Sequence, residues 1–155
     1  MGSCKKVKSL RTLLLERDGF QPGNSLRSLR ALRELPYSTS LKIGNLIHLR
    51  YLDLSHSSIT TLPESICSCW NLQTLKLNNC YSLVSLPKHL RRLRNLRHLN
   101  ISSCNSLTEM PLKIGELTNL KTLSDFVVGE KNGYGIGELH GLDLRGNLKI
   151  SDLLP

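Results

Sequence analysis

Five cysteines are the side chains of this sequence with the widest chemistry, because a thiolate can be a nucleophile, a metal ligand or half of a disulfide. Cys67 and Cys69 form one close pair, but no second ligand pair stands at the distance that a zinc site needs. The first residues lack the apolar segment of a signal peptide, so we expect reduced thiols in the cytosol. We therefore predict no metal site.

The histidines and glycines do not indicate catalysis either. Gly133-x-Gly135-x-Gly137 lacks the strand before it and the helix after it that a dinucleotide loop requires. We predict no catalytic residue and no cofactor site, and thus a protein that is not an enzyme. No nucleophile elbow or catalytic-cysteine context surrounds any of the histidines, which are His48, His56, His89, His98 and His140.

The formal net charge of +9 favours acidic partners by long-range attraction. The basic groups are scattered, apart from one dense stretch at residues 88–97. Its leucines keep the spacing of their neighbours along the chain, so we expect its charges to line a solvated outer face. Nucleic acid is kept only as a weaker alternative, which a steep fall of affinity with salt would reveal. No apolar run approaches the roughly 18 residues of a membrane span.

A regular step of leucines must position whatever site the chain has. The pattern Leu-x-x-Leu-x-Leu occupies residues 49–54 and 72–77, and returns at 96–101 with isoleucine in the last place. Two landmarks that advance together indicate a leucine-rich repeat, in which each unit supplies one strand and one return segment. The second landmark is a proline every 24 residues, at Pro63, Pro87 and Pro111.

These repeats predict an α/β fold, a right-handed leucine-rich-repeat solenoid with a parallel β-sheet on its concave face. Ile66, Leu90 and Ile114 stand at one step in the returns, where they seal the core opposite the strands. We expect mostly irregular or 3-10 helical returns. Cys80 and Cys104 occupy the Asn-or-Cys position after the strand, so each side chain should turn inward and meet the backbone of the bend.

The chain holds about six to seven such units in a single domain, 1–155. Residues 129–137 read as a glycine-rich inserted loop. Neither end shows a polar capping unit, which predicts a piece of a longer solenoid or a truncated product that is poorly soluble alone. Three units are irregular, and we assign them as Leu26, Leu29 and Ala31, with Ala31 in an inward slot; Leu120 and Leu123, before a break at Asp125 and Phe126; and Leu148 and Ile150, opening a seventh strand.

The residues of several units resemble a known family. Residues 49–55 and 59–66 resemble the repeat region of plant intracellular immune receptors, the coiled-coil class of nucleotide-binding leucine-rich-repeat disease-resistance proteins. Residues 119–129 are similar to an irregular unit of that class. Residues 136–139 and 144–150 are similar to the unit that follows it. The likeness covers nearly the whole chain and is weakest before about Leu26.

The resemblance implies a module that recognises protein and works in the cytoplasm, with the nucleus as an alternative. Its partners would be a pathogen effector, a guarded host protein, or the receptor's own nucleotide-binding domain, which the repeats help to hold inactive. This chain has no Gly-x-x-x-x-Gly-Lys-Ser/Thr loop, so no nucleotide-binding residue is carried over. The alternative is a free-standing intracellular leucine-rich-repeat scaffold in signalling.

The candidate binding residues are the outward positions of the strands, since side chains alternate along a strand and equivalent strands lie side by side. They form rows across the predicted concave face, with Tyr51 as an anchor at one side. The first row is Tyr51, Thr74, His98 and Thr122; the second is Asp53, Lys76, Asn100 and Ser124; the third is Ser55, Asn78 and Ser102.

Overall fold

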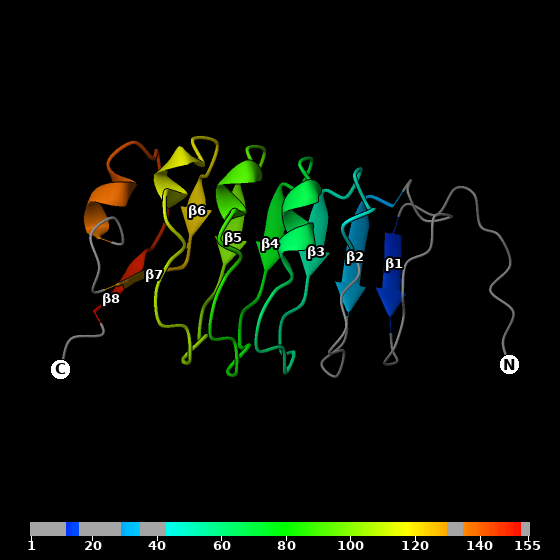
Figure 1. The fold of residues 1–155 in the computed structure, drawn as a ribbon, viewed down its shortest axis with the longest axis horizontal. Coiled ribbons are helices and arrows are strands. Elements are labelled where there is room, and N and C mark those ends of the chain that lie inside the picture. The colour runs from blue at the N-terminus through cyan, green and yellow to red at the C-terminus, as the bar shows by residue number, and fades with distance from the viewer. Residues whose placement is uncertain (1–11, 16–28, 35–42, 130–134, 153–155) are drawn as a thin grey trace, which may run out of the picture.

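The computed structural model describes residues 12–15, 29–34, 43–129 and 135–152, and it shows a row of stacked units (Figure 1). Six short strands pair in sequence order, each parallel to the next, so the sheet follows the repeats one by one. This arrangement confirms the predicted solenoid. The strands are β1 (Thr12–Leu15), β2 (Ala31–Glu34), β3 (Tyr51–Asp53), β4 (Thr74–Lys76), β5 (His98–Asn100) and β6 (Thr122–Leu123).

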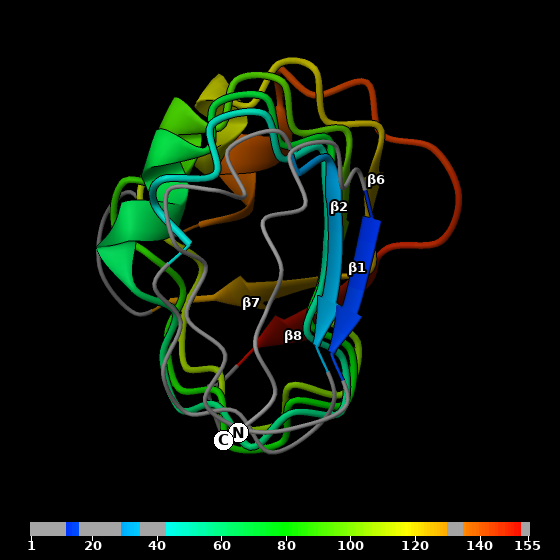
Figure 2. The ribbon, with the colours of Figure 1, turned by 90° about the vertical axis from the view of Figure 1, so that its right-hand side faces the viewer.

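The returns carry short 3-10 helices on the side of the core opposite the sheet (Figure 2). A return has to turn the chain only once, so a single helical turn is enough. The prediction of short 3-10 returns is confirmed. The helices are η2 (Glu64–Ser68), η3 (Leu90–Arg92), η4 (Ile114–Glu116) and η5 (Ile136–Leu139). None of the helices in the described ranges is long and apolar enough to cross a membrane.

The core is a column of leucines that follows the register of the sheet. Leu52 pairs with Leu75, and Leu75 with Leu99, so three residues from three units stack in equivalent slots. All three are fully buried or nearly so. Ile66 and Leu90 close the core from the return side and are also fully buried. Each unit therefore buries its apolar side against its neighbours rather than within itself.

The second unit corrects the sequence interpretation by one turn of pattern. Leu32, not Ala31, fills the inward slot, because Leu32 pairs with Leu13 on one side and Leu52 on the other. Ala31 lies outward, beside Tyr51. The error arose from extending the 23- to 24-residue step backwards, whereas the structure steps by 19 and then 20 residues (13→32→52).

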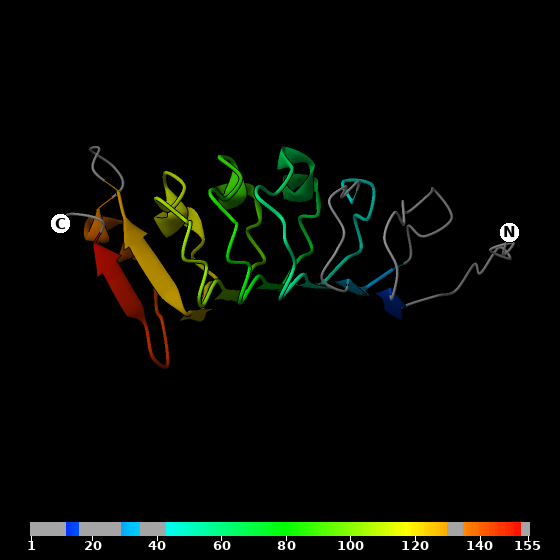
Figure 3. The same cartoon turned by 90° about the horizontal axis from the view of Figure 1, so that it is seen from below.

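The six-stranded sheet stops at β6, which has only two residues. The chain then forms β7 (Asp125–Val128), which pairs with β8 (Lys149–Asp152) in a separate two-stranded sheet. Figures 2 and 3 show that β7 and β8 leave the line of the first six strands and run crosswise to them. The break predicted at Asp125 and Phe126 is confirmed. The predicted seventh strand exists, but it pairs with β7 instead of β6.

The segment predicted as a glycine-rich loop is described only in part. Residues 130–134 lie outside the described ranges, and Ile136 and Gly137 already begin η5. This helix packs closely on η4: a Cβ added to Gly115 would stand 2.3 Å from the Glu138 carbonyl oxygen. The Gly115 N–H also donates to the Glu138 carboxylate at 3.2 Å. A glycine is therefore required where these two returns meet.

The dense basic stretch lies as the leucine spacing predicts. Leu90, Leu93 and Leu96 are fully buried, while Arg92 and Arg94 between them are exposed. Apolar side chains three residues apart turn to the core, and the charges between them face solvent. The prediction of a solvated outer face is confirmed for these positions.

Candidate functional site: the outer face of the sheet

The outer face of the sheet β1–β6, termed here the sheet face, carries the predicted binding rows. Strand pairing sets Tyr51 beside Thr74, Thr74 beside His98, and His98 beside Thr122, so the first row is continuous. In the second row the register joins Asp53, Lys76 and Asn100. Residues 23 or 24 positions apart in the sequence thus become neighbours on one surface. Parallel strands of a sheet lie roughly 4.8 Å apart.

Asp53 is the most enclosed polar group on the sheet face, with 7% of its surface exposed. Its Oδ1 accepts hydrogen bonds from the Ser55 N–H at 3.1 Å and the Ser55 hydroxyl at 2.6 Å. Its Oδ2 accepts from the Tyr51 hydroxyl at 3.1 Å. The Arg33 guanidinium stands 3.7 Å from the same oxygen. The sequence predicted Asp53 to point outward, but its neighbours cover it.

Arg33 is a part of this cluster that the sequence interpretation missed. It pairs with Asp53 in the register of β2 and β3, so it belongs to the second row. The omission follows from the misplaced second unit, since the assignment of Ala31 as inward shifts every outward position of β2. The signal was present as Leu29-x-x-Leu32, which matches the first two leucines of the later units.

The third row is built on a turn that recurs. Asn100 Oδ1 accepts from the N–H of Ser102 at 3.0 Å and from its hydroxyl at 2.8 Å. The same arrangement joins Asp53 and Ser55, one side chain bonding the backbone two residues on. The Ser55 hydroxyl also lies 2.6 Å from Asn78 Oδ1 in the next unit. The third row is thus held in place within units and between them.

Two contacts hold the larger side chains of the sheet face. The Lys76 ammonium lies 5.6 Å from the centre of the Tyr51 ring, within the range of a cation–π interaction. The exposed ring of His98 places Nδ1 2.9 Å from Thr122 Oγ1. Tyrosine and histidine therefore stand on the face in defined positions, which lowers the entropy cost of binding a partner there.

Ser124 stands apart from the row to which the sequence assigned it. It follows β6 by one residue, at the bend that leads to β7. Its Oγ accepts a hydrogen bond from the Ile101 N–H at 2.9 Å, the kind of bond that a backbone carbonyl makes elsewhere in the ladder. Ser124 therefore ends the sheet, and its hydroxyl is already engaged.

The cysteines after the strands form a buried ladder, as the repeat spacing predicts. Cys80 Sγ donates to the Leu54 carbonyl at 3.2 Å, and Cys104 Sγ to the Leu77 carbonyl at 3.1 Å. Ser57 takes the same place one unit earlier, 3.3 Å from Cys80 Sγ. Burial raises the pKa of Cys104 to about 12, so its thiol stays protonated. Cys67 and Cys69 are buried too, and within the described residues no three metal-ligating side chains gather.

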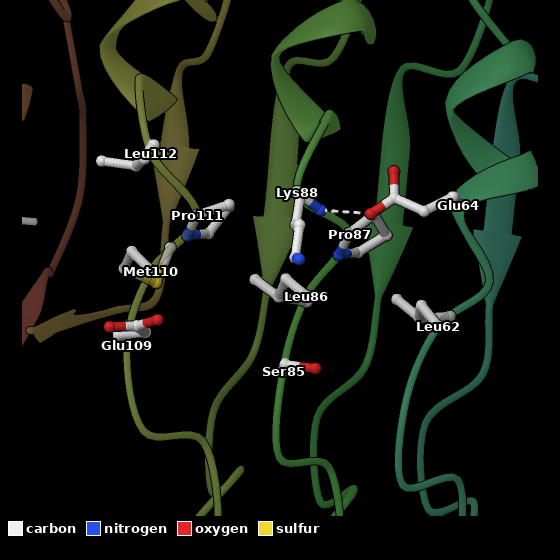
Figure 4. Close-up of a pocket in the computed structure, with 10 residues that line it drawn as sticks. All are labelled: Leu62, Glu64, Ser85, Leu86, Pro87, Lys88, Glu109, Met110, Pro111 and Leu112. Carbon is white, nitrogen blue, oxygen red and sulfur yellow. Dashed lines mark hydrogen bonds between the residues drawn. The ribbon is translucent and has the colours of Figure 1, made fainter.

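A groove of about 430 Å³ lies between the returns, away from the sheet face (Figure 4). It follows the proline step, because proline has no N–H with which to bond the neighbouring unit. The Lys88 N–H beside it donates to the Glu64 carboxylate. Its walls mix apolar and charged residues: Leu62, Glu64, Ser85, Leu86, Pro87, Lys88, Glu109, Met110, Pro111 and Leu112.

We predict that Asp53 makes the stability depend on acid pH. Burial acts to raise the pKa of Asp53, but hydrogen bonds from Ser55 and Tyr51 and the charge of Arg33 outweigh it and lower the pKa. A carboxyl with a lowered pKa stabilises the fold above its unfolded value of about 3.9 and loses this contribution as the pH falls through the folded value. Asp53→Asn should therefore lose less stability than the parent chain between neutral pH and strong acid.

Urea unfolding at neutral and acidic pH measures this difference. Asp143→Asn, on an exposed carboxyl, is the control in high salt, which screens its contact with Lys121. Equal acid losses in the parent chain and in Asp53→Asn would contradict the prediction.

The fold and the rows of outward residues define a repeat protein of the solenoid class. The sequence pattern of the family described as "Leucine-rich repeat region" matches residues 2–150. The chain belongs to this family.

Two curated relatives are plant disease resistance proteins. One from Arabidopsis thaliana is 60% identical over 134 residues, which cover 84% of this chain and 9% of the relative. The other is the disease resistance protein RGA2 of Solanum bulbocastanum, 52% identical over 171 residues, which cover 86% of this chain and 18% of RGA2. The chain thus spans less than a fifth of the length of either relative.

Solved structures share the fold. A leucine-rich repeat protein of Leptospira interrogans matches 97% of this chain and 42% of its own, with a TM-score of 0.64 and 27% identity. The plant peptide hormone receptor RGFR1, solved in complex with RGF2, matches 83% of this chain and 25% of its own, with a TM-score of 0.51 and 22% identity. The second likeness concerns the fold alone.

Proposed function

We propose that this chain is the protein-recognition region of an intracellular plant immune receptor and that the sheet face is its binding surface. The observation that carries the proposal is the likeness to two plant disease resistance proteins over more than four fifths of the chain. The sheet face supports it, because three rows of polar side chains, anchored by Tyr51, lie on a rigid scaffold. The partner is a pathogen effector or a host protein that the receptor guards, and the site of action is the cytoplasm.

A solenoid of this size offers a broad surface, which suits recognition of a folded partner. Aromatic residues carry a large share of the binding energy at protein interfaces, so Tyr51 is the strongest single candidate on the sheet face. His98 lies two strands away in the same row and is exposed. The same region also restrains a nucleotide-operated switch when no partner is bound.

The test uses leaves that express the gene product containing this chain together with a panel of pathogen effectors. We expect Tyr51→Ala combined with His98→Ala to abolish the cell-death response to the effector that elicits it, because loss of a hot-spot residue costs about 2 kcal/mol or more. Arg92→Gln, exposed on the return side, should leave the response intact. An unchanged response with the double variant would refute the sheet face as the binding surface.

Restraint of the switch is tested separately, without any effector. Deletion of residues 43–129 from the same gene product should produce cell death on its own. A silent deletion variant that still accumulates in the leaf would contradict the restraining role.

A further inference from the structure

A second surface lies at the edge where the chain passes from the returns into the strands, at the top in Figure 2. This edge, termed here the upper rim, comprises residues 47–50, 70–73, 94–97 and 118–121. The four segments contain three arginines, one lysine, one histidine and one tryptophan, but no aspartate or glutamate. The upper rim is therefore basic along its whole length.

Two hydrogen-bond ladders hold the backbone of the upper rim. An asparagine of each unit donates to a carbonyl of the unit before it: Asn71 to Ile47 at 2.8 Å, Asn95 to Trp70 at 2.9 Å, and Asn119 to Arg94 at 2.8 Å. The second ladder runs through backbone groups alone, from the N–H of Gln73 to the carbonyl of Arg50 and onward by one unit at a time. The upper rim thus presents its side chains from a fixed base.

The second ladder also aligns the basic side chains. It joins the backbones of consecutive units at Arg30, Arg50, Gln73, Arg97, Lys121 and Arg145, with separations of 2.7 to 2.8 Å. Arg50 and Arg97 stand two units apart, or roughly 10 Å at the spacing of parallel strands. Like charges in one row repel each other, so the row gains free energy when an anion neutralises it.

Acidic groups of the chain neutralise only one end of this row. Asp143 lies 2.8 Å from the Lys121 ammonium and 3.6 Å from the Arg145 guanidinium. In the described part of the chain, no ion pair reaches Arg50, Arg94 or Arg97. Within the rim these three arginines surround the segment of Trp70, whose side chain is 54% exposed. An exposed tryptophan beside free arginines is the composition that dominates binding energy at protein interfaces.

We propose that the upper rim is a docking surface for an acidic segment of another polypeptide. Carboxylates of the segment pair with Arg50 and Arg97, and an apolar side chain between them covers Trp70. An extended chain advances roughly 3.3 Å per residue, so carboxylates three residues apart match the spacing of the two arginines. This surface is distinct from the sheet face and goes beyond the function proposed above.

The chemistry favours a polypeptide over a nucleic acid. Proteins that bind DNA strongly engage about 6 to 10 phosphates, whereas the upper rim offers three free arginines in the described ranges. Single-stranded nucleic acid also needs successive aromatic platforms, and Trp70 is the only tryptophan of the chain. A short segment with a few carboxylates and one apolar side chain fits these groups better.

The emission of this single tryptophan reports occupancy of the upper rim directly. The probe is a short synthetic peptide with glutamate at every third position and a central leucine, and its counterpart carries glutamine in place of glutamate. We expect the acidic peptide to shift the Trp70 emission to shorter wavelength, since the ring leaves water, and the glutamine peptide to leave it unchanged. An unshifted emission at millimolar acidic peptide would overturn the proposal.

Substitution of arginine by glutamine separates the row from the overall charge. Gln73 already occupies this row with the same backbone bonds, so Arg50→Gln and Arg97→Gln preserve the local fold. The double variant should bind the acidic peptide about tenfold more weakly or less tightly still, because it removes both charge partners. Lys88→Gln with Arg92→Gln removes the same charge from the return side and should change the affinity less than about twofold.

Two further results decide between the alternatives. Equal weakening in both double variants would show a net-charge effect and overturn the docking surface. Tighter binding of a single-stranded oligonucleotide, lost with Arg50→Gln and Arg97→Gln, would assign the upper rim to nucleic acid instead. Tyr51→Ala with His98→Ala should leave peptide binding unchanged, so failure of the sheet face and failure of the upper rim are distinguishable.

Discussion

Leu75→Ala should lower the free energy of unfolding by about 2–5 kcal/mol, the range for deletion of a fully buried leucine side chain. Leu75 has no exposed surface, and its strand lies between those of Leu52 and Leu99. The cavity therefore opens in the middle of the leucine column. Both neighbouring units lose contacts at once, and in a solenoid such contacts between units supply much of the stability.

Urea unfolding followed by circular dichroism measures the loss. Thr74→Ala is the matched control, because Thr74 is the preceding residue of the same strand and faces outward. We expect its effect to stay within about 0.5 kcal/mol. If Thr74→Ala destabilised the chain as much as Leu75→Ala, the inward and outward assignment of the strands would be wrong.

Phe126→Ala should cost about 3–5 kcal/mol, the largest loss we expect from one side chain. Phe126 is fully buried and stands where the six-stranded sheet gives way to β7 and β8. Leucine is the regular core residue of the earlier units, so the larger ring fills the wider space that the change of direction creates. Its loss should loosen the end of the solenoid more than the middle.

Hydrogen exchange resolved along the chain tests both the size and the place of this effect. Backbone amides of β7 and β8 should exchange faster in Phe126→Ala, while those of β3 and β4 should change little. Ile150→Ala is the control: Ile150 pairs with Phe126 in register, but 48% of its surface is exposed. Uniform acceleration in every strand would contradict a local role for Phe126.

The central units were predictable from sequence because their step is constant. Leucines 23 or 24 residues apart had to fill equivalent slots, and Leu52, Leu75 and Leu99 do so. The same step placed Cys80 and Cys104 inside the bend, where each thiol meets a backbone carbonyl. A periodic pattern carries this information because every turn of the coil poses the same packing problem.

The irregular units were less predictable. The early step shortens, and a three-residue shift exchanged Ala31 for Leu32 and hid Arg33 from the second row. At the other end a break in the pattern was visible at Asp125, but the direction in which β7 leaves the sheet depends on packing around Phe126. Local sequence does not encode that direction.

Contacts between units were also hidden, although their spacing was present. Asn71, Asn95 and Asn119 recur at the leucine step, yet only the structure shows that they bond the preceding unit. The enclosure of Asp53 is another case, since it depends on Tyr51, Ser55 and Arg33 closing around one carboxylate. Alternation along a strand predicts the direction of a side chain but not what covers it.

Nuclear Overhauser effects between outward side chains of neighbouring units test the continuity of the sheet face most directly. We expect cross-peaks between the Tyr51 ring and the ε-methylene of Lys76, and between the His98 ring and the Thr122 methyl group, whose hydroxyl lies 2.9 Å from His98 Nδ1. Tyr51→Phe and His98→Gln assign the ring signals. If the Tyr51 ring instead showed cross-peaks to the core methyl groups of Leu52 and Leu75, the rows would not form one surface and the proposed binding face would be wrong.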